Sequence, residues 1–152
     1  MDNYSSVREI LEETGKYTSF TSGRSMWPLI HHQKDNIIVV APDGRLKKYD
    51  IALYEDGHGR YVLHRVVEVH GDHYIIIGDN CVRRERVTDD MICGVLAGFY
   101  KNGKHYVDCR DGMLQKIYAR LWTSLYPVRP AILFAERAAG KIKRILKGKK
   151  DE

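Results

Sequence analysis

Ser25 is the residue of this sequence whose neighbours best suit a nucleophile. It lies in the segment Ser-Gly-Arg-Ser-Met-Trp-Pro at 22–28. A serine hydroxyl is a weak nucleophile unless a base lies beside it and its backbone is held in a defined, exposed conformation. Gly23 allows a sharp turn before it, and Pro28 biases Trp27 towards an extended backbone. The segment therefore favours acyl transfer at Ser25, although a Gly-x-Ser sequence alone is most often an ordinary loop.

His64 is the candidate general base for such a nucleophile. It lies in the apolar run 60–69, which predicts a strand, and alternation places its side chain on the same face as Val62 and Val66. Partial burial on that face disfavours the imidazolium and keeps the ring able to accept a proton near neutral pH. Taken alone, a histidine in this setting is usually a hydrogen-bonded core residue.

Asp79 is a candidate for the acid behind His64. The run Ile-Ile-Ile at 75–77 predicts a buried strand that ends in the turn Gly-Asp-Asn at 78–80. A carboxylate at that strand end, across a hairpin from the His64 strand, would orient the imidazole and stabilise its charged form. Considered without Ser25 and His64, the same segment would be interpreted as an ordinary turn.

Four segments, in this order, resemble those of the type I signal peptidase family, which shares a superfamily with the LexA-type self-cleaving repressors. The resemblance covers residues 20–98, about half of the chain. The segments are Ser-Gly-Arg-Ser-Met-Trp-Pro at 22–28, Tyr-Asp-Ile-Ala-Leu-Tyr at 49–54, His-Arg-Val-Val at 64–67 and Gly-Asp-Asn at 78–80.

The resemblance implies a role for each matching position. Ser25 matches the nucleophile of the family, and His64 matches the general base, which is lysine in most bacterial members and histidine in the endoplasmic-reticulum and archaeal type. Asp79 matches the acid of the Gly-Asp-Asn segment. A second acid is expected a few residues later, where Glu85 stands in place of the usual aspartate. Either Asp79 or Glu85 is then the third catalytic residue.

Two departures from the family pattern bear on function. Some members carry, two positions before the nucleophile, a serine that helps to bind the oxyanion. Gly23 stands there in this chain, so the oxyanion would depend on backbone N–H groups, chiefly that of Ser25. Met26 and Trp27 are the expected residues of the substrate groove. No counterpart of the N-terminal membrane anchor of classical signal peptidases is expected in this sequence, so the resemblance implies the chemistry without naming the substrate.

The fold expected for this chain is mainly β, a small coiled sheet or partial barrel of the signal peptidase and LexA-like type. Val7, Ile10 and Leu11 predict a short N-terminal helix over 4–14, which Gly15 ends. Apolar runs separated by turn residues predict a β-rich region over 18–108. The expected strands are 37–40, 49–54, 60–69, 73–77, 91–100 and 104–108.

Residues 112–152 differ in character from the peptidase domain expected over 1–111. Apolar residues recur at helical spacing from Leu114 to Trp122, Pro127 and Pro130 break the pattern, and 132–146 resumes as a basic amphipathic helix. Residues 114–150 hold ten Lys and Arg against one acid.

This basic, apolar tail either packs on the sheet or lies on an anionic membrane surface. Nucleic acid is less favoured as its partner, because the apolar content is high and no recognition motif accompanies the charge.

Other chemistries are less well supported. Cys81, Cys93 and Cys109 form neither a disulfide framework nor a zinc ligand set, which favours a reducing compartment. The remaining histidines lack metal-ligand spacing, so neither a metal nor a cofactor is expected. Lys47 and Lys48 lie in a charged turn and are weaker candidates for the base than His64. No apolar run is long enough for a membrane-spanning helix.

The sequence thus predicts a serine endopeptidase that cleaves a precursor or leader peptide in the cytoplasm, attached peripherally to the inner face of the membrane or free. Two alternatives remain. One is a peptide- or membrane-binding module that kept the fold without turnover. The other is a LexA-like autopeptidase, and two features of the sequence argue against it. Only 24 residues precede Ser25, which are too few for a DNA-binding domain. The candidate bonds for self-cleavage, Cys93-Gly94 and Ala139-Gly140, lie downstream of Ser25 rather than upstream.

Overall fold

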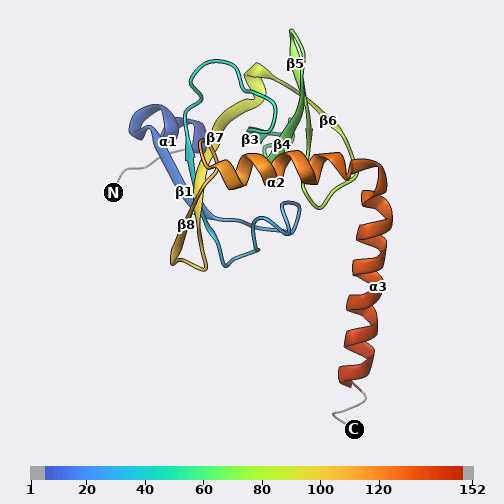
Figure 1. The fold of residues 1–152 in the computed structure, drawn as a ribbon. Helices are drawn as coiled ribbons and strands as arrows, with labels where there is room; N and C mark the ends of the chain where they lie inside the picture. Colours follow the sequence, from blue (N-terminus) through green and yellow to red (C-terminus); the bar gives the residue numbers. More distant parts are fainter. Residues whose placement is uncertain (1–5, 149–152) are drawn as a thin grey trace.

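The computed structural model describes residues 6–148, with side chains as far as residue 144. It is mainly β, an antiparallel sheet of eight strands that does not close, with helices at both ends (Figure 1). The strands are β1 (Lys16–Phe20), β2 (Asn36–Val40), β3 (Ile51–Glu55), β4 (Tyr61–Val69), β5 (His73–Ile77), β6 (Glu85–Thr88), β7 (Ile92–Lys101) and β8 (His105–Asp108). The helices are α1 (Val7–Thr14), α2 (Met113–Ser124) and α3 (Arg129–Gly148), with single 3-10 turns η1 (Asp89–Met91) and η2 (Tyr126–Val128).

The strands run in the order β1-β2-β7-β3-β4-β5-β6, and β8 pairs with β7. The long strand β7 therefore joins the N-terminal pair β1–β2 to the β3–β6 meander. The register shifts by one residue between Ile38 and Val39 in the β2–β7 pair, and again between Leu53 and Tyr54 in the β3–β7 pair. Because such irregularities bend a strand and increase its twist, they curve the sheet around the apolar side chains that it buries.

The sheet buries two apolar clusters. One cluster holds Leu11 of α1, Met26, Ile30, Leu53 and Leu63 among its members. The other is built on Tyr54, Val66, Tyr74, Ile76 and Val95 with their neighbours. Adjacent residues of β3 and β4 thus contribute to opposite clusters, as the alternation of side chains along a strand requires.

The predicted N-terminal helix is confirmed over Val7–Thr14. The Ser6 side chain accepts a hydrogen bond from the Glu9 N–H at its start, and Gly15 ends it in a left-handed conformation with φ 71°. Residues 4 and 5 of the predicted span lie outside the described residues.

The six predicted strands are present, with ends that differ by up to two residues. Asn102 and Gly103 form the hairpin turn with φ 51° and 69°, and His70 closes the other turn by donating its N–H to the His73 carbonyl. The sequence did not predict β1 and β6 as separate strands. Pro130 lies in the first turn of α3 rather than interrupting the helix, since a proline in that turn lacks only an N–H that has no partner there.

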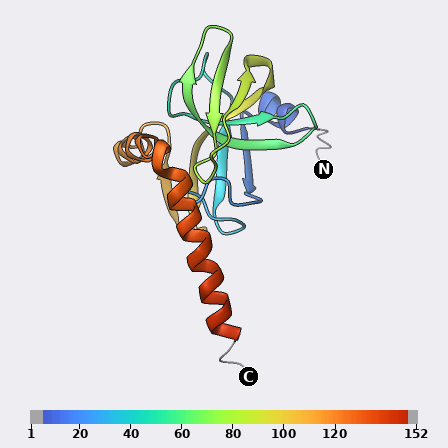
Figure 2. The ribbon, with the colours of Figure 1, turned by 90° about the vertical axis from the view of Figure 1, so that its right-hand side faces the viewer.

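The C-terminal helices differ in how they contact the sheet. α2 runs beside the sheet and contacts the loop that follows β5, whereas α3 extends away from the body of the molecule (Figures 1 and 2). Within the part of the chain that the structure describes, no helix is both long enough and apolar enough to cross a membrane.

Candidate functional site

Ser25 lies in the loop between β1 and β2, half-buried, and the Gly-Asp-Asn turn holds that loop. Gly23 adopts φ 88°, the left-handed conformation that permits the sharp turn expected before Ser25. The Asn80 N–H donates to the Ser25 carbonyl at 2.7 Å, and the Asn80 side-chain amide donates to the Arg24 carbonyl at 3.0 Å. Two segments about 55 residues apart in the sequence are thereby fixed against each other.

His64 is 7% exposed on β4, opposite Ala52 of β3. Its Nδ1 lies 3.0 Å from a Glu85 carboxylate oxygen. The Tyr54 hydroxyl, one diagonal position away across the β3–β4 pair, donates to the same oxygen and lies 3.3 Å from Nδ1. Since an ionised carboxylate only accepts, Nδ1 carries the proton in this contact and Nε2 is left with its lone pair.

Burial lowers the pKa of His64 below its usual 6.5, and the nearby Glu85 charge and hydrogen bond oppose that shift. The imidazole is therefore neutral at pH 7, the form in which it can accept a proton. Burial, and then the contact with Glu85, raise the pKa of Tyr54, so that phenol remains a donor.

Gly78 is the point where the two candidate groups meet. A Cβ built on Gly78 would lie 2.9 Å from Nε2 of His64, 2.8 Å from the Ser25 carbonyl oxygen and 2.8 Å from the sulfur of Cys81. Only a residue without a side chain allows the free nitrogen of His64 and the backbone of Ser25 to approach this closely. No hydrogen bond joins the Ser25 hydroxyl to His64 among the described residues. The two residues therefore lie close together at Gly78 without a direct hydrogen bond between them.

Gly78→Ala is expected to lower the free energy of unfolding by about 1–3 kcal/mol, because two of the three groups in its way are backbone or a fixed ring. Gly71→Ala is the matched control. A Cβ at Gly71 meets nothing within 4 Å, so its effect should stay within about 0.5 kcal/mol. Urea unfolding measures both, and equal effects would show that the approach at Gly78 is not tight.

Asp79 binds Arg65 rather than His64. Its two carboxylate oxygens accept from Nε of Arg65 at 2.8 Å and from a terminal nitrogen at 2.7 Å. Both residues are buried, at 1% and 2% exposure. Arg65 follows His64 on β4, so its side chain lies on the opposite face of the strand. Of the two acids expected from the sequence, Glu85 is the one that contacts His64.

The Gly-Asp-Asn turn is also held from the C-terminal side. The Trp122 indole donates to the Asp79 carbonyl at 2.9 Å, and the Tyr118 hydroxyl donates to the Asp79 carboxylate at 3.2 Å. The buried Arg129 donates to the carbonyls of Cys81 at 3.3 Å and of Trp122 at 3.0 Å. Residues 118–129, the first part of the C-terminal segment, therefore help to hold the Gly-Asp-Asn turn in place.

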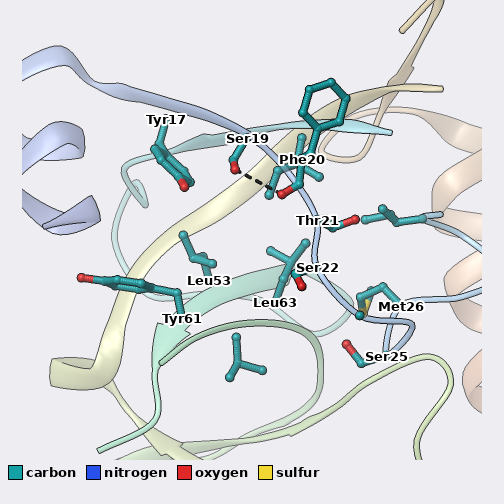
Figure 3. Close-up of a pocket in the computed structure, with 14 residues that line it drawn as sticks. Tyr17, Ser19, Phe20, Thr21, Ser22, Ser25, Met26, Leu53, Tyr61 and Leu63 are labelled. Atoms are coloured by element: carbon teal, nitrogen blue, oxygen red, sulfur yellow. Dashed lines mark hydrogen bonds between the residues drawn. The ribbon is translucent and has the colours of Figure 1, made fainter. Parts of the chain in front are cut away.

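A pocket of about 320 Å³ opens beside Ser25. In Figure 3, Ser25 and Met26 lie at one side of it and Tyr17 and Tyr61 at the other. Its walls come from β1, the loop that carries Ser25, β2, β3 and β4. Met26, expected in the substrate groove, lines this pocket, whereas Trp27 does not.

The two residues expected to support an oxyanion differ in their backbone N–H groups. The Gly23 N–H donates to Nδ1 of His32 at 2.9 Å. Among residues 6–148, none accepts a hydrogen bond from the Ser25 N–H.

Two residues of this site were not assigned a role from the sequence. Tyr54 and Asn80 contact the two candidate groups, and both fall inside the segments quoted for the resemblance. Their contacts depend on strand register and on the path of a loop, which the types of residue do not reveal. No cluster of three or more His, Cys, Asp or Glu within the described ranges could hold a metal ion.

Compared with known proteins, the chain matches no protein-family model and no curated protein.

Proposed function

We propose that this protein is a serine endopeptidase of the signal-peptidase type, with Ser25 as nucleophile, His64 as general base and Glu85 as the acid behind it. The observation that carries the proposal is the position of His64. Its Nδ1 contacts Glu85 at 3.0 Å, while its Nε2 faces Gly78, next to the backbone of Ser25. A buried, neutral imidazole oriented by a carboxylate towards a half-buried serine is the arrangement that activates a hydroxyl.

In this mechanism the Ser25 hydroxyl attacks the scissile carbonyl carbon while its proton passes to Nε2 of His64. The resulting oxyanion accepts a hydrogen bond from the Ser25 N–H. The imidazolium gives its proton to the leaving amine, and an acyl-enzyme remains on Ser25. Water then attacks the ester and loses a proton to His64, which returns that proton to the Ser25 oxygen as the peptide acid is released. A rotation of the Ser25 side chain towards Nε2 when substrate binds is part of the proposal.

The substrate we propose is an extended segment of a precursor or leader peptide. β1 pairs only with β2 among the described strands and so presents one open edge. An added peptide strand can satisfy such an edge with main-chain hydrogen bonds. A peptide beside Ser19 and Phe20 of β1 would place apolar side chains in the pocket and its carbonyl groups near Ser25.

The coiled fold of the signal peptidase and LexA-like type belongs to the same proposal. A location in the cytoplasm belongs to it as well. Cysteines stay free in a reducing compartment, and this structure has three free thiols among its described residues, those of Cys81, Cys93 and Cys109.

Labelling by a fluorophosphonate probe tests the proposal directly. Wild-type protein should become labelled on Ser25, and the labelling should be lost in His64→Ala. A protein that keeps its fold and is not labelled at any pH would instead be the non-catalytic binding module. Cleavage of the chain by itself during long incubation would indicate the LexA-like autopeptidase.

The pH dependence of peptide cleavage should follow His64. The base acts in its neutral form, so activity is present above its pKa and is lost as the pH falls through a midpoint below 6.5. A lysine base would instead require alkaline pH. Glu85→Gln removes a charge that raises this pKa, so the midpoint should move to still lower pH while kcat falls by about 10²-fold or more.

Glu13→Gln, an exposed change on α1, is the control and should alter neither quantity. A midpoint that stays in place or rises in Glu85→Gln would remove Glu85 from the site.

A further inference from the structure

The outward face of α2 carries an exposed apolar stripe, which consists of Met113, Leu114, Ile117 and Leu121. These side chains are 75%, 82%, 47% and 63% exposed. Spacings of three and four residues place Leu114, Ile117 and Leu121 in a row along one side of the helix. Leucines and isoleucines this exposed and this close together mark an interaction surface.

α2 cannot turn this stripe inward, because its opposite face is fixed to the body of the protein. Ala119 is buried at 2% exposure, and Tyr118 and Trp122 both donate hydrogen bonds to Asp79. Figure 2 shows α2 nearly end-on at the margin of the molecule, outside the sheet. The stripe thus faces away from the core.

Basic side chains accompany the stripe. Lys116 and Arg120 are exposed on α2 itself. Arg137, Lys141, Lys143 and Arg144 are exposed along α3. The one acid of α3, Glu136, is already paired with Arg24 at 3.2 Å. The two C-terminal helices therefore combine exposed apolar side chains with a net positive charge.

We propose that the α2 stripe inserts into the interface of an anionic lipid bilayer, with Lys116, Arg120 and the basic residues of α3 at the headgroups. A helix of 12 residues is about 18 Å long, too short to span the hydrocarbon core, but suited to lie in the plane of the interface. A second copy of the chain fits less well, because pairing two stripes would bring Lys116 and Arg120 of both copies together. Lipid binding by this stripe does not require the chemistry proposed at Ser25.

Co-sedimentation with vesicles tests the proposal. The full chain should bind vesicles of phosphatidylcholine and phosphatidylglycerol at low ionic strength, and bind vesicles of phosphatidylcholine alone at least tenfold more weakly. Each basic group near an anionic surface strengthens binding by about fivefold. Lys116→Gln with Arg120→Gln should therefore weaken binding by about 25-fold, and Leu114→Gln with Leu121→Gln by at least tenfold.

Val69→Gln is the control, since Val69 is also exposed, at 42%, but lies on β4 away from the stripe. It should bind as the wild type does. Equal binding to neutral and anionic vesicles, or equal loss in Val69→Gln, would overturn the proposal. So would a concentration-dependent dimer, measured by sedimentation velocity, that Leu114→Gln with Leu121→Gln disrupts.

Discussion

Ser25→Ala is expected to lower kcat/KM for a cleaved peptide by about 10⁴-fold or more, because it removes the only atom that can form the acyl-enzyme. The free energy of unfolding should change by no more than about 0.5 kcal/mol, since the half-buried Ser25 hydroxyl takes part in none of the hydrogen bonds described above. The measurement is the release of product from a fluorogenic peptide that the wild type cleaves.

Ser124→Ala is the matched control. It also removes one serine hydroxyl, but from the exposed end of α2, where the group bonds only to the Leu121 carbonyl. Its activity should stay within about threefold of the wild type. Turnover by Ser25→Ala that equals that of Ser124→Ala would mean that the chemistry lies elsewhere in the molecule.

Asp79→Asn is expected to produce the largest loss of stability among the single changes considered, about 3–5 kcal/mol. The substitution preserves the shape of the side chain but leaves the guanidinium of Arg65, 2% exposed, without its counter-charge. An unpaired charge in that environment is far more costly than the loss of an ordinary hydrogen bond. Chemical denaturation at pH 7 measures the effect.

Asp72→Asn breaks an ion pair of similar length, to Arg86 at 2.7 Å, between side chains that are 72% and 60% exposed. Because water screens such a pair, this control should cost no more than about 1 kcal/mol. Arg65→Met combined with Asp79→Asn removes the stranded charge and should recover at least half of the loss. Equal costs for Asp79→Asn and Asp72→Asn would contradict the account of the buried pair.

The strands with long apolar runs could be predicted from the sequence, whereas the two polar edge strands could not. β1 reads Lys-Tyr-Thr-Ser-Phe and alternates between exposed and half-buried side chains. β6 reads Glu-Arg-Val-Thr and buries only Val87. Neither contains the hydrophobic run that marks a strand, and both are stable because a neighbouring strand supplies their hydrogen bonds.

The candidate site was predictable as a set of residues but not as a set of contacts. Ser25 and His64 stand out by type and by neighbours, and the structure places both beside Gly78. The choice between Asp79 and Glu85 depended on which face of β4 each acid reaches. Alternation already placed Arg65 opposite His64. What the sequence lacked was the path of the loop from β5 to β6, which carries Asp79 to one face and Glu85 to the other.

The turn that holds Ser25 is shared between the two proposed binding surfaces, and this has a thermodynamic consequence. Asn80 fixes the loop of the nucleophile, while the neighbouring Asp79 receives hydrogen bonds from Tyr118 and Trp122 of α2. Any ligand of α2 that shifts this turn would alter the affinity for peptide, and reciprocity then requires peptide to alter the affinity for that ligand by the same factor. Occupancy of one surface would thus be reported at the other, without a contact between the two ligands.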